Sequence, residues 1–253
     1  MSRDKSPFFV GYLSVPGELR AFVWTLAVGL TILGVAMGYW IGTTQDDPGP
    51  GAFRFDFGPQ TVTGVIELTP LPILHVTEGS ERIGAGHALM LSGQGKNGAQ
   101  TRSAAVNGQR VTASGILLQR GKIDMLQLRG GTNGLQTAEG SGEIPPTENL
   151  GRWRLAGEIC DGKCLAGAMR PGRGLAHKAC ANLCVAGGVP PVFVSSQPVE
   201  GQDFMMISGP GQTEIPAALY DFMAQFITVE GNISRHGDLL VFAMDPETIK
   251  VLP

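Results

Sequence analysis

All four cysteines of the chain fall within 25 residues, in a stretch that also carries a histidine and a methionine. The spacing is C-x3-C, then fifteen residues, then C-x3-C, and the set is Cys160, Cys164, Met169, His177, Cys180 and Cys184. Thiolate, imidazole and thioether groups are ligands for soft metal ions, and grouped thiols also form disulfides or carry redox chemistry. This stretch is where the sequence concentrates its capacity for chemistry.

Structural disulfides are the chemistry that the cysteine spacing favours. Cysteines one helical turn apart point in diverging directions and bridge each other poorly, so we expect the first pair to be joined to the second. Each bridge would stabilise the fold by about 2–4 kcal/mol.

A metal site is the main alternative, with the cysteines joined by His177 and Met169. Zinc sites usually show C-x2-C spacing, and a thioether beside thiolates suits copper better than zinc. An iron–sulfur cluster is a less favoured variant. A thiol–disulfide redox pair is least favoured, because its usual motif is C-x-x-C at the start of a helix.

Two stretches are predicted to be helical. In the first, residues 176–185, His177, Cys180 and Cys184 share one face, because positions three and seven residues apart align on a helix. Glycine at 187 and 188 and proline at 190 and 191 then end it. The second covers residues 216–225, with proline in its first turn.

The rest of the chain after position 50 has the pattern of short strands. Phe53, Phe55 and Phe57 alternate with charged residues, which is typical of a half-buried strand. A strand with an internal glycine, followed by an aliphatic residue, occurs four times, at Gly64, Gly115, Gly157 and Gly231. Glycine inside a strand marks a bulge or a sharp bend. We therefore predict a mainly β domain, either small barrels of OB type, one or two of them, or a sandwich.

Two polar glycine-rich loops, residues 93–99 and 130–142, are long for a compact domain. We expect each to be mobile or to lie against a partner. The other three histidines, His75, His87 and His236, are scattered among apolar and turn residues and are predicted to be ordinary surface or core residues.

One segment is predicted to cross a membrane. Residues 21–42 contain no charge, and about 20 apolar residues suffice to span a bilayer core. Trp24 near one end and Tyr39 and Trp40 near the other fit the aromatic belts of the two interfaces. A signal peptide would have a shorter apolar core and a small-x-small cleavage site, so a transmembrane anchor is favoured.

The charges beside this segment predict its orientation. Arg3, Lys5 and Arg20 precede it and Asp46 and Asp47 follow it, so the positive-inside rule places the N-terminus in the cytoplasm. The large C-terminal domain would then be periplasmic, in a bacterial inner membrane.

A glycine stripe on the same segment, Gly34, Gly38 and Gly42, would let a partner helix approach closely. The apolar arm before it, residues 6–13, is expected to lie on the membrane surface or on a partner subunit.

The predicted organisation has five parts. They are a cytoplasmic arm (1–20), a transmembrane helix (21–43), a linker with a first strand (44–58), a β subdomain (59–150), and a cysteine-containing β subdomain with short helices (151–253).

The segment D-x-K-C…P-G-x-G…H-x-x-C-A-x-x-C…G-G-x-P-P, here residues 161–191, together with the N-terminal PFFVGYL and one helix, resembles a family of bacterial single-pass membrane-anchored proteins. The match covers about a fifth of the chain. The resemblance implies a bacterial inner-membrane setting and no particular activity.

Composition narrows the function further. The net charge is −3 and the pI is near 5.8, so a nucleic-acid binder is not expected. No phosphate-binding loop, nucleophile elbow or paired-carboxylate motif is present, so no enzyme is predicted. We expect a non-catalytic accessory subunit of a membrane electron-transfer complex, without a cofactor and in contact with other subunits and lipid. The alternative is a metal-binding or redox module that uses the Cys/His cluster and holds copper or zinc.

Overall fold

The computed structural model describes residues 15–44, 49 and 51–252, and it divides into two units, residues 1–47 and 48–253. The predicted apolar arm at residues 6–13 lies outside the described residues. The same is true of the flanking charges Arg3, Lys5, Asp46 and Asp47.

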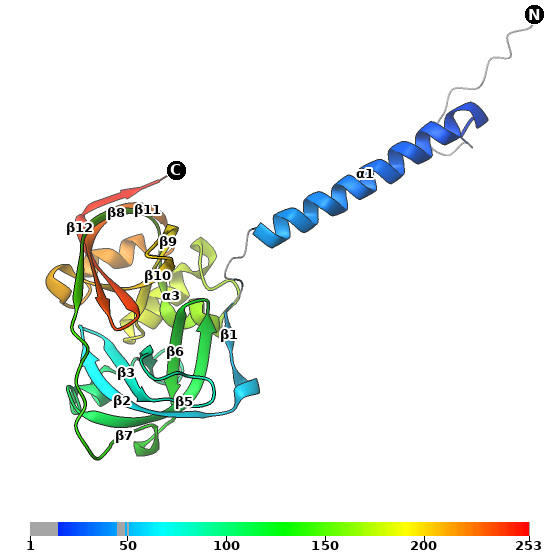
Figure 1. Cartoon of the computed structure of the whole chain (residues 1–253). Helices are drawn as coiled ribbons and strands as arrows, with labels where there is room; N and C mark the ends of the chain where they lie inside the picture. Colours follow the sequence, from blue (N-terminus) through cyan, green and yellow to red (C-terminus); the bar gives the residue numbers. More distant parts are fainter. Residues whose placement is uncertain (1–14, 45–48, 50, 253) are drawn as a thin grey trace, which may run out of the picture. The chain divides into compact units, whose positions relative to one another are not determined.

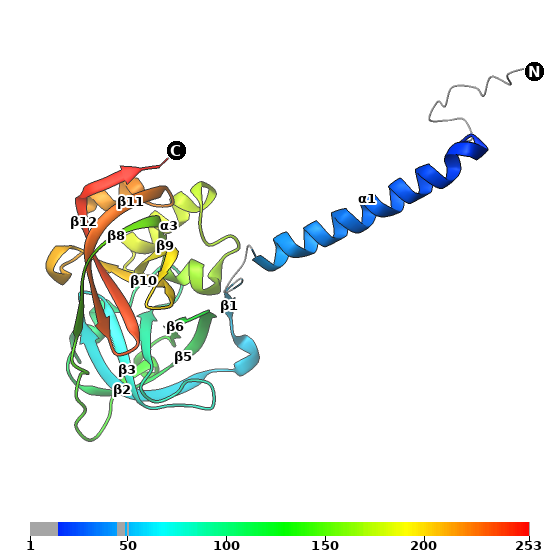
Figure 2. The ribbon, with the colours of Figure 1, turned by 45° about the horizontal axis from the view of Figure 1, so that its top comes forward.

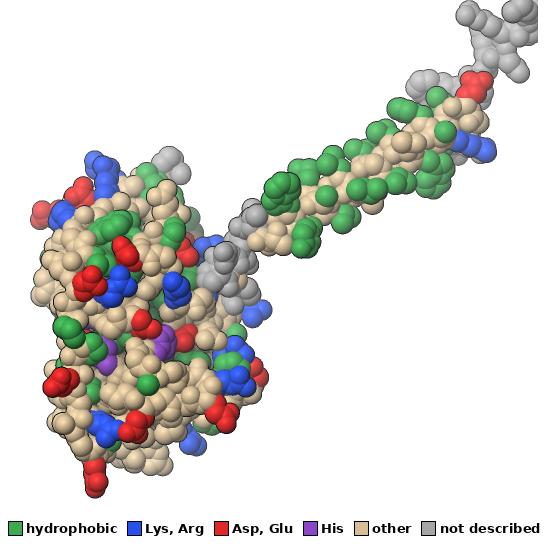
Figure 3. Space-filling model, in the orientation of Figure 1, with side chains coloured by type: hydrophobic (Ala, Val, Ile, Leu, Met, Phe, Trp, Pro, Cys, Tyr) green, Lys and Arg blue, Asp and Glu red, His purple; other side chains and the backbone are tan. Residues whose placement is uncertain are grey.

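The first unit contains one helix, α1, Gly17–Thr44, which starts four residues before the predicted span (Figure 1). It is long and apolar enough to cross a membrane from Gly17 to Thr43, a property that anchors and signal sequences share. Two of its hydroxyls are satisfied within the helix, because Thr25 Oγ1 and Thr31 Oγ1 donate to carbonyls one turn earlier, at 2.8 Å each. Hydrophobic side chains cover the visible face of this helix (Figure 3).

The second unit is built mainly from strands. They are β1 Ala52–Phe53, β2 Gln60–Leu68, β3 Pro72–Glu78, β4 Ala88–Ser92, β5 Arg110–Arg120, β6 Ile123–Leu128, β7 Leu135–Thr137, β8 Glu148–Asp161, β9 Pro191–Val199, β10 Gln202–Ser208, β11 Phe226–His236 and β12 Leu239–Val251. Its helical elements are α2 Gln100–Ala104, α3 Lys178–Ala186 and the short η1 Phe55–Phe57, η2 Thr132–Gly134, η3 Cys164–Ala168, η4 Leu175–His177, η5 Pro210–Gln212 and η6 Ala217–Phe222.

Ten of these strands form two five-stranded barrels with the same connectivity, and β1 and β7 each pair with β5 of the first barrel (Figures 1 and 2). In the first, β2 pairs with β3 and β5, β3 with β4, and β5 with β6, all antiparallel, while β4 and β6 are parallel. In the second, β8, β9, β10, β11 and β12 repeat those ladders in the same order, again with one parallel pair, β10 with β12. Three meandering strands closed by a later hairpin are the OB arrangement. The prediction of a mainly β domain of small barrel or sandwich type is confirmed in its barrel form, and the barrel occurs twice.

The four repeated glycines occupy equivalent positions in the two barrels. Each lies in the first or fourth strand of its barrel, at a point where a Cβ atom would meet a carbonyl oxygen of the neighbouring strand. That oxygen lies 2.2 Å from the Cβ position at Gly64, 2.2 Å at Gly115, 2.1 Å at Gly157 and 2.3 Å at Gly231. Only glycine lets the two strands approach this closely, so the repeated pattern in the sequence reflects the bend that closes each barrel.

The structure corrects two of the expected elements. The phenylalanine-rich strand stops at Phe53, and the chain turns into η1, with the rings of Phe53 and Phe55 stacked at 5.2 Å. Arg54 lies over the Phe57 ring at 3.5 Å and holds the turn. The second predicted helix is the 3-10 segment η6, which is shorter than expected.

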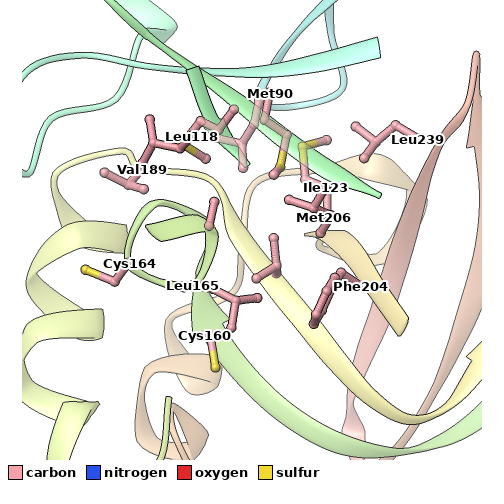
Figure 4. Close-up of a cluster of buried hydrophobic side chains, with 14 of the residues drawn as sticks. Met90, Leu118, Ile123, Cys160, Cys164, Leu165, Val189, Phe204, Met206 and Leu239 are labelled. Atoms are coloured by element: carbon pink, nitrogen blue, oxygen red, sulfur yellow. The ribbon is translucent and has the colours of Figure 1, made fainter. Parts of the chain in front are cut away.

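Each barrel has its own apolar interior, and a third apolar cluster joins the two barrels. This seam includes Leu118 and Met90 from the first barrel and Phe204 and Leu239 from the second (Figure 4). The two barrels therefore share buried surface, and Cys160, Cys164 and Cys184 belong to it.

Candidate functional site

The cysteine segment is an insertion in the second barrel. The first barrel connects its first two strands, β2 and β3, through residues 69–71 alone, whereas the second connects β8 and β9 through residues 162–190. Asp161 and Pro191 at the two ends are paired in the sheet, and the Gly162 N–H donates to the Pro190 carbonyl at 2.7 Å. The barrel thus fixes both ends of the insertion without requiring its length, which indicates that the insertion serves something other than barrel closure.

Local sequence explains how the insertion folds back on itself. Gly172 packs on the Cys164 peptide, where a Cβ would lie 2.4 Å from the carbonyl oxygen. The insertion then runs through η4 into α3, as the sequence predicted. Gly188, with φ of +90°, ends that helix because this left-handed conformation suits glycine.

Three of the four cysteines come together. The Sγ atoms of Cys164, Cys180 and Cys184 all lie within 4.8 Å of one another. Cys164 and Cys184 are buried, and Cys180 is half-buried. The sulfur of Met169, a side chain that is 45% exposed, lies 3.5 Å from Cys180 Sγ. Three thiols are thus grouped beside α3, with a thioether next to one of them.

The fourth cysteine is separate, and the expected disulfides are wrong. All four cysteines are free thiols. Cys160 lies at the end of β8, where its thiol donates to Glu158 Oε1 at 3.2 Å and its sulfur points in a different direction from that of Cys164 (Figure 4). Because β8 directs Cys160 into the seam while Cys164 starts the next turn, the two cannot act as one pair.

A buried Asp–His pair supports the Cys164 side of the cluster. Asp161 Oδ1 accepts the Cys164 N–H at 2.8 Å, and its Oδ2 lies 2.8 Å from His177 Nε2. Asp161, Cys164 and His177 can also each offer an atom to a common ion. Of the residues that the structure describes, none hydrogen-bonds to the buried Nδ1 of His177. The pair fixes both the turn that carries Cys164 and the first residue ahead of α3.

Two lysines bring positive charge to the sulfurs. Lys96, from the loop after β4 in the first barrel, donates from Nζ to Cys180 Sγ at 2.7 Å and also lies 3.6 Å from Cys184 Sγ. Lys163 is only 3% exposed, and its Nζ donates to the carbonyls of Gly93 and Gly95 at 2.7 Å each. The loop at residues 93–99, expected to be mobile or against a partner, packs on the insertion of the same chain.

The pKa values of the thiols differ with their surroundings. A hydrogen bond from the Cys164 thiol, with help from Lys96, lowers the pKa of Cys184 to about 7. The same contact and burial hold the pKa of Cys164 well above its usual range. Burial likewise raises the pKa of Cys160. The Cys164 thiol and Lys96 thus shift Cys184 toward the thiolate, which is the form that binds metals.

These supporting groups were not equally visible in the sequence. Asp161 and Lys163 belong to the D-x-K-C segment but were not identified as functional. Nothing in the sequence around Lys96, apart from its glycine-rich loop, indicates a contact with the cysteines. Lys96 belongs to the first barrel and reaches them only in the folded chain.

A second polar cluster joins two of the other three histidines, His75 and His236, which were expected to be ordinary surface or core residues. Glu67 on the first barrel contacts His75 Nε2 at 2.6 Å and, across the seam, His236 Nδ1 at 2.7 Å. Burial acts to raise the pKa of Glu67, but hydrogen bonds from His236, His75 and Thr69 hold it well below its usual range. Histidine side chains lie in the middle of the β domain, next to acidic ones, in Figure 3.

The third histidine forms a second link between the barrels. His87 Nδ1 lies 2.5 Å from Asp238 Oδ2, in the β11–β12 turn, and its Nε2 lies 3.1 Å from Asp124 Oδ2 on β6. Hydrogen bonds to Asp124 and Asp238 raise the pKa of His87 to about 9.

This link predicts a pH-dependent part of the stability. Because the pKa of His87 is about 9 in the folded chain, against 6.5 for an ordinary histidine, its contribution is complete below pH 6.5 and is lost as the pH rises through 9. Allowing for solvent screening, it amounts to about 2 kcal/mol. We expect the gap in melting temperature between the wild type and His87→Gln to narrow between pH 7 and pH 10, and a constant gap would contradict the assignment.

The predicted membrane residues all lie on α1. Trp24 and Tyr39 are 70% and 75% exposed, and a Cβ at Gly34, Gly38 or Gly42 would meet nothing within 4 Å. Trp40 is 73% exposed. Their roles at the interface and in helix packing stay predictions.

Comparison with known proteins adds no relative. No family model, no curated protein and no solved structure matches the chain.

Proposed function

We propose that this protein is a membrane-anchored module that binds a thiophilic metal ion through Cys164, Cys180 and Cys184. The observation that carries the proposal is the meeting of three Sγ atoms within 4.8 Å, on an insertion that the first barrel lacks. Thiolates select soft ions such as copper(I), zinc and cadmium. Met169 or His177 supplies the nearest further donor.

The cellular setting is part of the proposal. The apolar helix anchors the chain in a bacterial inner membrane, with the N-terminus cytoplasmic and the barrels periplasmic, as the flanking charges favour. Thiols in that compartment tend to oxidise, and a bound metal ion would keep three neighbouring thiols as ligands. Metal binding would therefore explain how an exported domain keeps its cysteines as free thiols.

A direct binding measurement tests the site. The full chain, purified in mild detergent, reduced and freed of metal, is titrated with cadmium(II) and with copper(I). We expect one ion per chain, seen as sulfur-to-metal charge-transfer absorbance, and loss of at least about ten-fold in affinity for Cys184→Ser, because a buried ligand is removed.

Cys160→Ala is the matched control, because its thiol bonds to Glu158 and lies outside the cluster. This variant should bind metal as the wild type does, and far-ultraviolet circular dichroism should show that both variants fold. A wild-type chain that binds neither ion, or equal loss in both variants, would reject the site.

The accessory-subunit hypothesis is compatible with this module and stays a prediction. The glycine stripe on α1 is the feature that favours it, since a neighbouring helix would meet no side chain at those positions. Co-purification in a fixed ratio with other membrane subunits after gentle solubilisation would support it, and isolation of the native chain alone would count against it.

A further inference from the structure

We infer that Lys96 determines the specificity of the thiol cluster, and that its ammonium group makes the site prefer a monovalent ion of the copper(I) class over divalent zinc or cadmium. The inference rests on the proposed metal site and adds the charge of the ion that it selects. It depends on how the first barrel presents Lys96 to the sulfurs.

The loop that carries Lys96 is held against the insertion at several points. The Gly98 N–H donates to the Gly187 carbonyl at 2.8 Å, and Gln100 Nε2 donates to the Gly188 carbonyl at 2.6 Å. A Cβ at Gly98 would lie 1.9 Å from the Gly188 oxygen, and one at Gly187 would lie 2.0 Å from the Lys96 oxygen. The backbones are therefore in direct contact, which fixes where the Lys96 side chain begins.

Lys163 strengthens this arrangement from inside the insertion. Its buried ammonium group donates to two carbonyls of the Lys96 loop. Because Lys163 directly precedes Cys164, these hydrogen bonds hold the loop against the start of the cysteine insertion. Two ammonium groups thus belong to the cluster, one buried and one at the outer side. Asp161 places a carboxylate against Cys164, and this charge is the same whichever ion binds.

The charge of the complex depends on the ion. Three thiols that bind a monovalent ion release three protons and leave a complex of charge −2, whereas the same three thiols leave −1 with a divalent ion. The Lys96 ammonium group is attracted more strongly to a complex of charge −2 than to one of charge −1. Whatever the protonation of the empty site, the two complexes differ by one unit of negative charge next to Lys96.

The size of the effect follows from Coulomb's law. An ammonium a few ångströms from one extra negative charge, exposed to solvent on one side, changes a binding constant by about ten-fold. Lys96 is such a group, since its Nζ lies 2.7 Å from Cys180 Sγ and its side chain is exposed. Removing its charge should therefore weaken copper(I) binding about ten-fold more than cadmium(II) binding.

The test uses the full chain in detergent, with Lys96→Gln and Lys96→Arg as variants. Copper(I) affinity is measured without oxygen against a competing chelator, and cadmium(II) affinity by charge-transfer absorbance. We expect Lys96→Gln to lose about ten-fold more affinity for copper(I) than for cadmium(II), and Lys96→Arg to restore most of the loss.

Lys178→Gln is the matched control, because Lys178 begins α3 but its Nζ donates to the Asp221 carbonyl at 2.6 Å. It should change neither affinity. Equal losses for both ions in Lys96→Gln, no loss at all, or failure of arginine to restore copper(I) binding would overturn the inference while leaving the metal site in place. A wild type that binds neither ion would instead reject the proposed function.

Discussion

Gly157→Ala is expected to destabilise the second barrel by about 3 kcal/mol or more, or to prevent it from folding. A Cβ at this position would lie 2.1 Å from the Val194 carbonyl oxygen and 2.9 Å from the Phe193 ring. The oxygen belongs to the backbone of β9, so it cannot move aside without breaking the β8–β9 ladder. β9 also follows the cysteine insertion directly, so the thiol cluster should be disturbed as well.

Gly84→Ala provides the control for this substitution. Gly84 lies in a loop, and a Cβ there would meet nothing within 4 Å. Thermal unfolding of the full chain in detergent, followed by far-ultraviolet circular dichroism, should show a large drop in melting temperature for Gly157→Ala and almost none for Gly84→Ala. Equal melting temperatures would show that the bend tolerates a side chain and that the repeated glycine has another origin.

The glycine bend shows what the sequence could reveal about this fold. The pattern of a strand, a glycine and an aliphatic residue is local, and each barrel repeats it twice because each barrel bends at two equivalent places. By contrast, the phenylalanine alternation near residue 55 failed as a strand, because Phe53 and Phe55 stack and the chain turns there.

The candidate site was predictable only in part. The insertion brings its own ligands, so the grouping of Cys180 and Cys184 with Met169 could be anticipated from their spacing and from the helix. Whether the thiols form disulfides could not be predicted from the spacing, because disulfide formation depends on the direction of each Cα–Cβ bond. Lys96 lies 84 residues before Cys180 and reaches it through the packing of two barrels, a relation that leaves no periodic trace.

The contacts of the histidines could not be predicted from the sequence either, because their partners lie even further away along the chain. His236 is 169 residues from Glu67, and the two meet only because the barrels dock. Taken singly, each histidine lies among apolar or turn residues and gives no indication of a partner.

This contact carries the second large prediction, that Glu67→Gln destabilises the chain by about 3–5 kcal/mol. The carboxylate accepts from His75, His236 and Thr69, with 12% of its side chain exposed. A glutamine offers one acceptor oxygen and a donor amide, so at least one buried histidine would face a donor. The loss should fall mainly on the docking of the barrels, since Glu67 and His236 belong to different ones.

Glu78→Gln is the matched control, because Glu78 pairs with Arg110 at the surface and its side chain is 66% exposed. Exposed pairs contribute at most about 1 kcal/mol, so its melting temperature should stay near that of the wild type. The Glu67 contribution is present above pH 4.5, the ordinary pKa of a glutamate side chain, and is lost as the pH falls through the lower pKa of the folded chain. The gap between the wild type and Glu67→Gln should therefore persist at pH 5 and shrink in stronger acid. If the two glutamine variants melted together at pH 7, the Glu67 contact would not be holding the barrels in place.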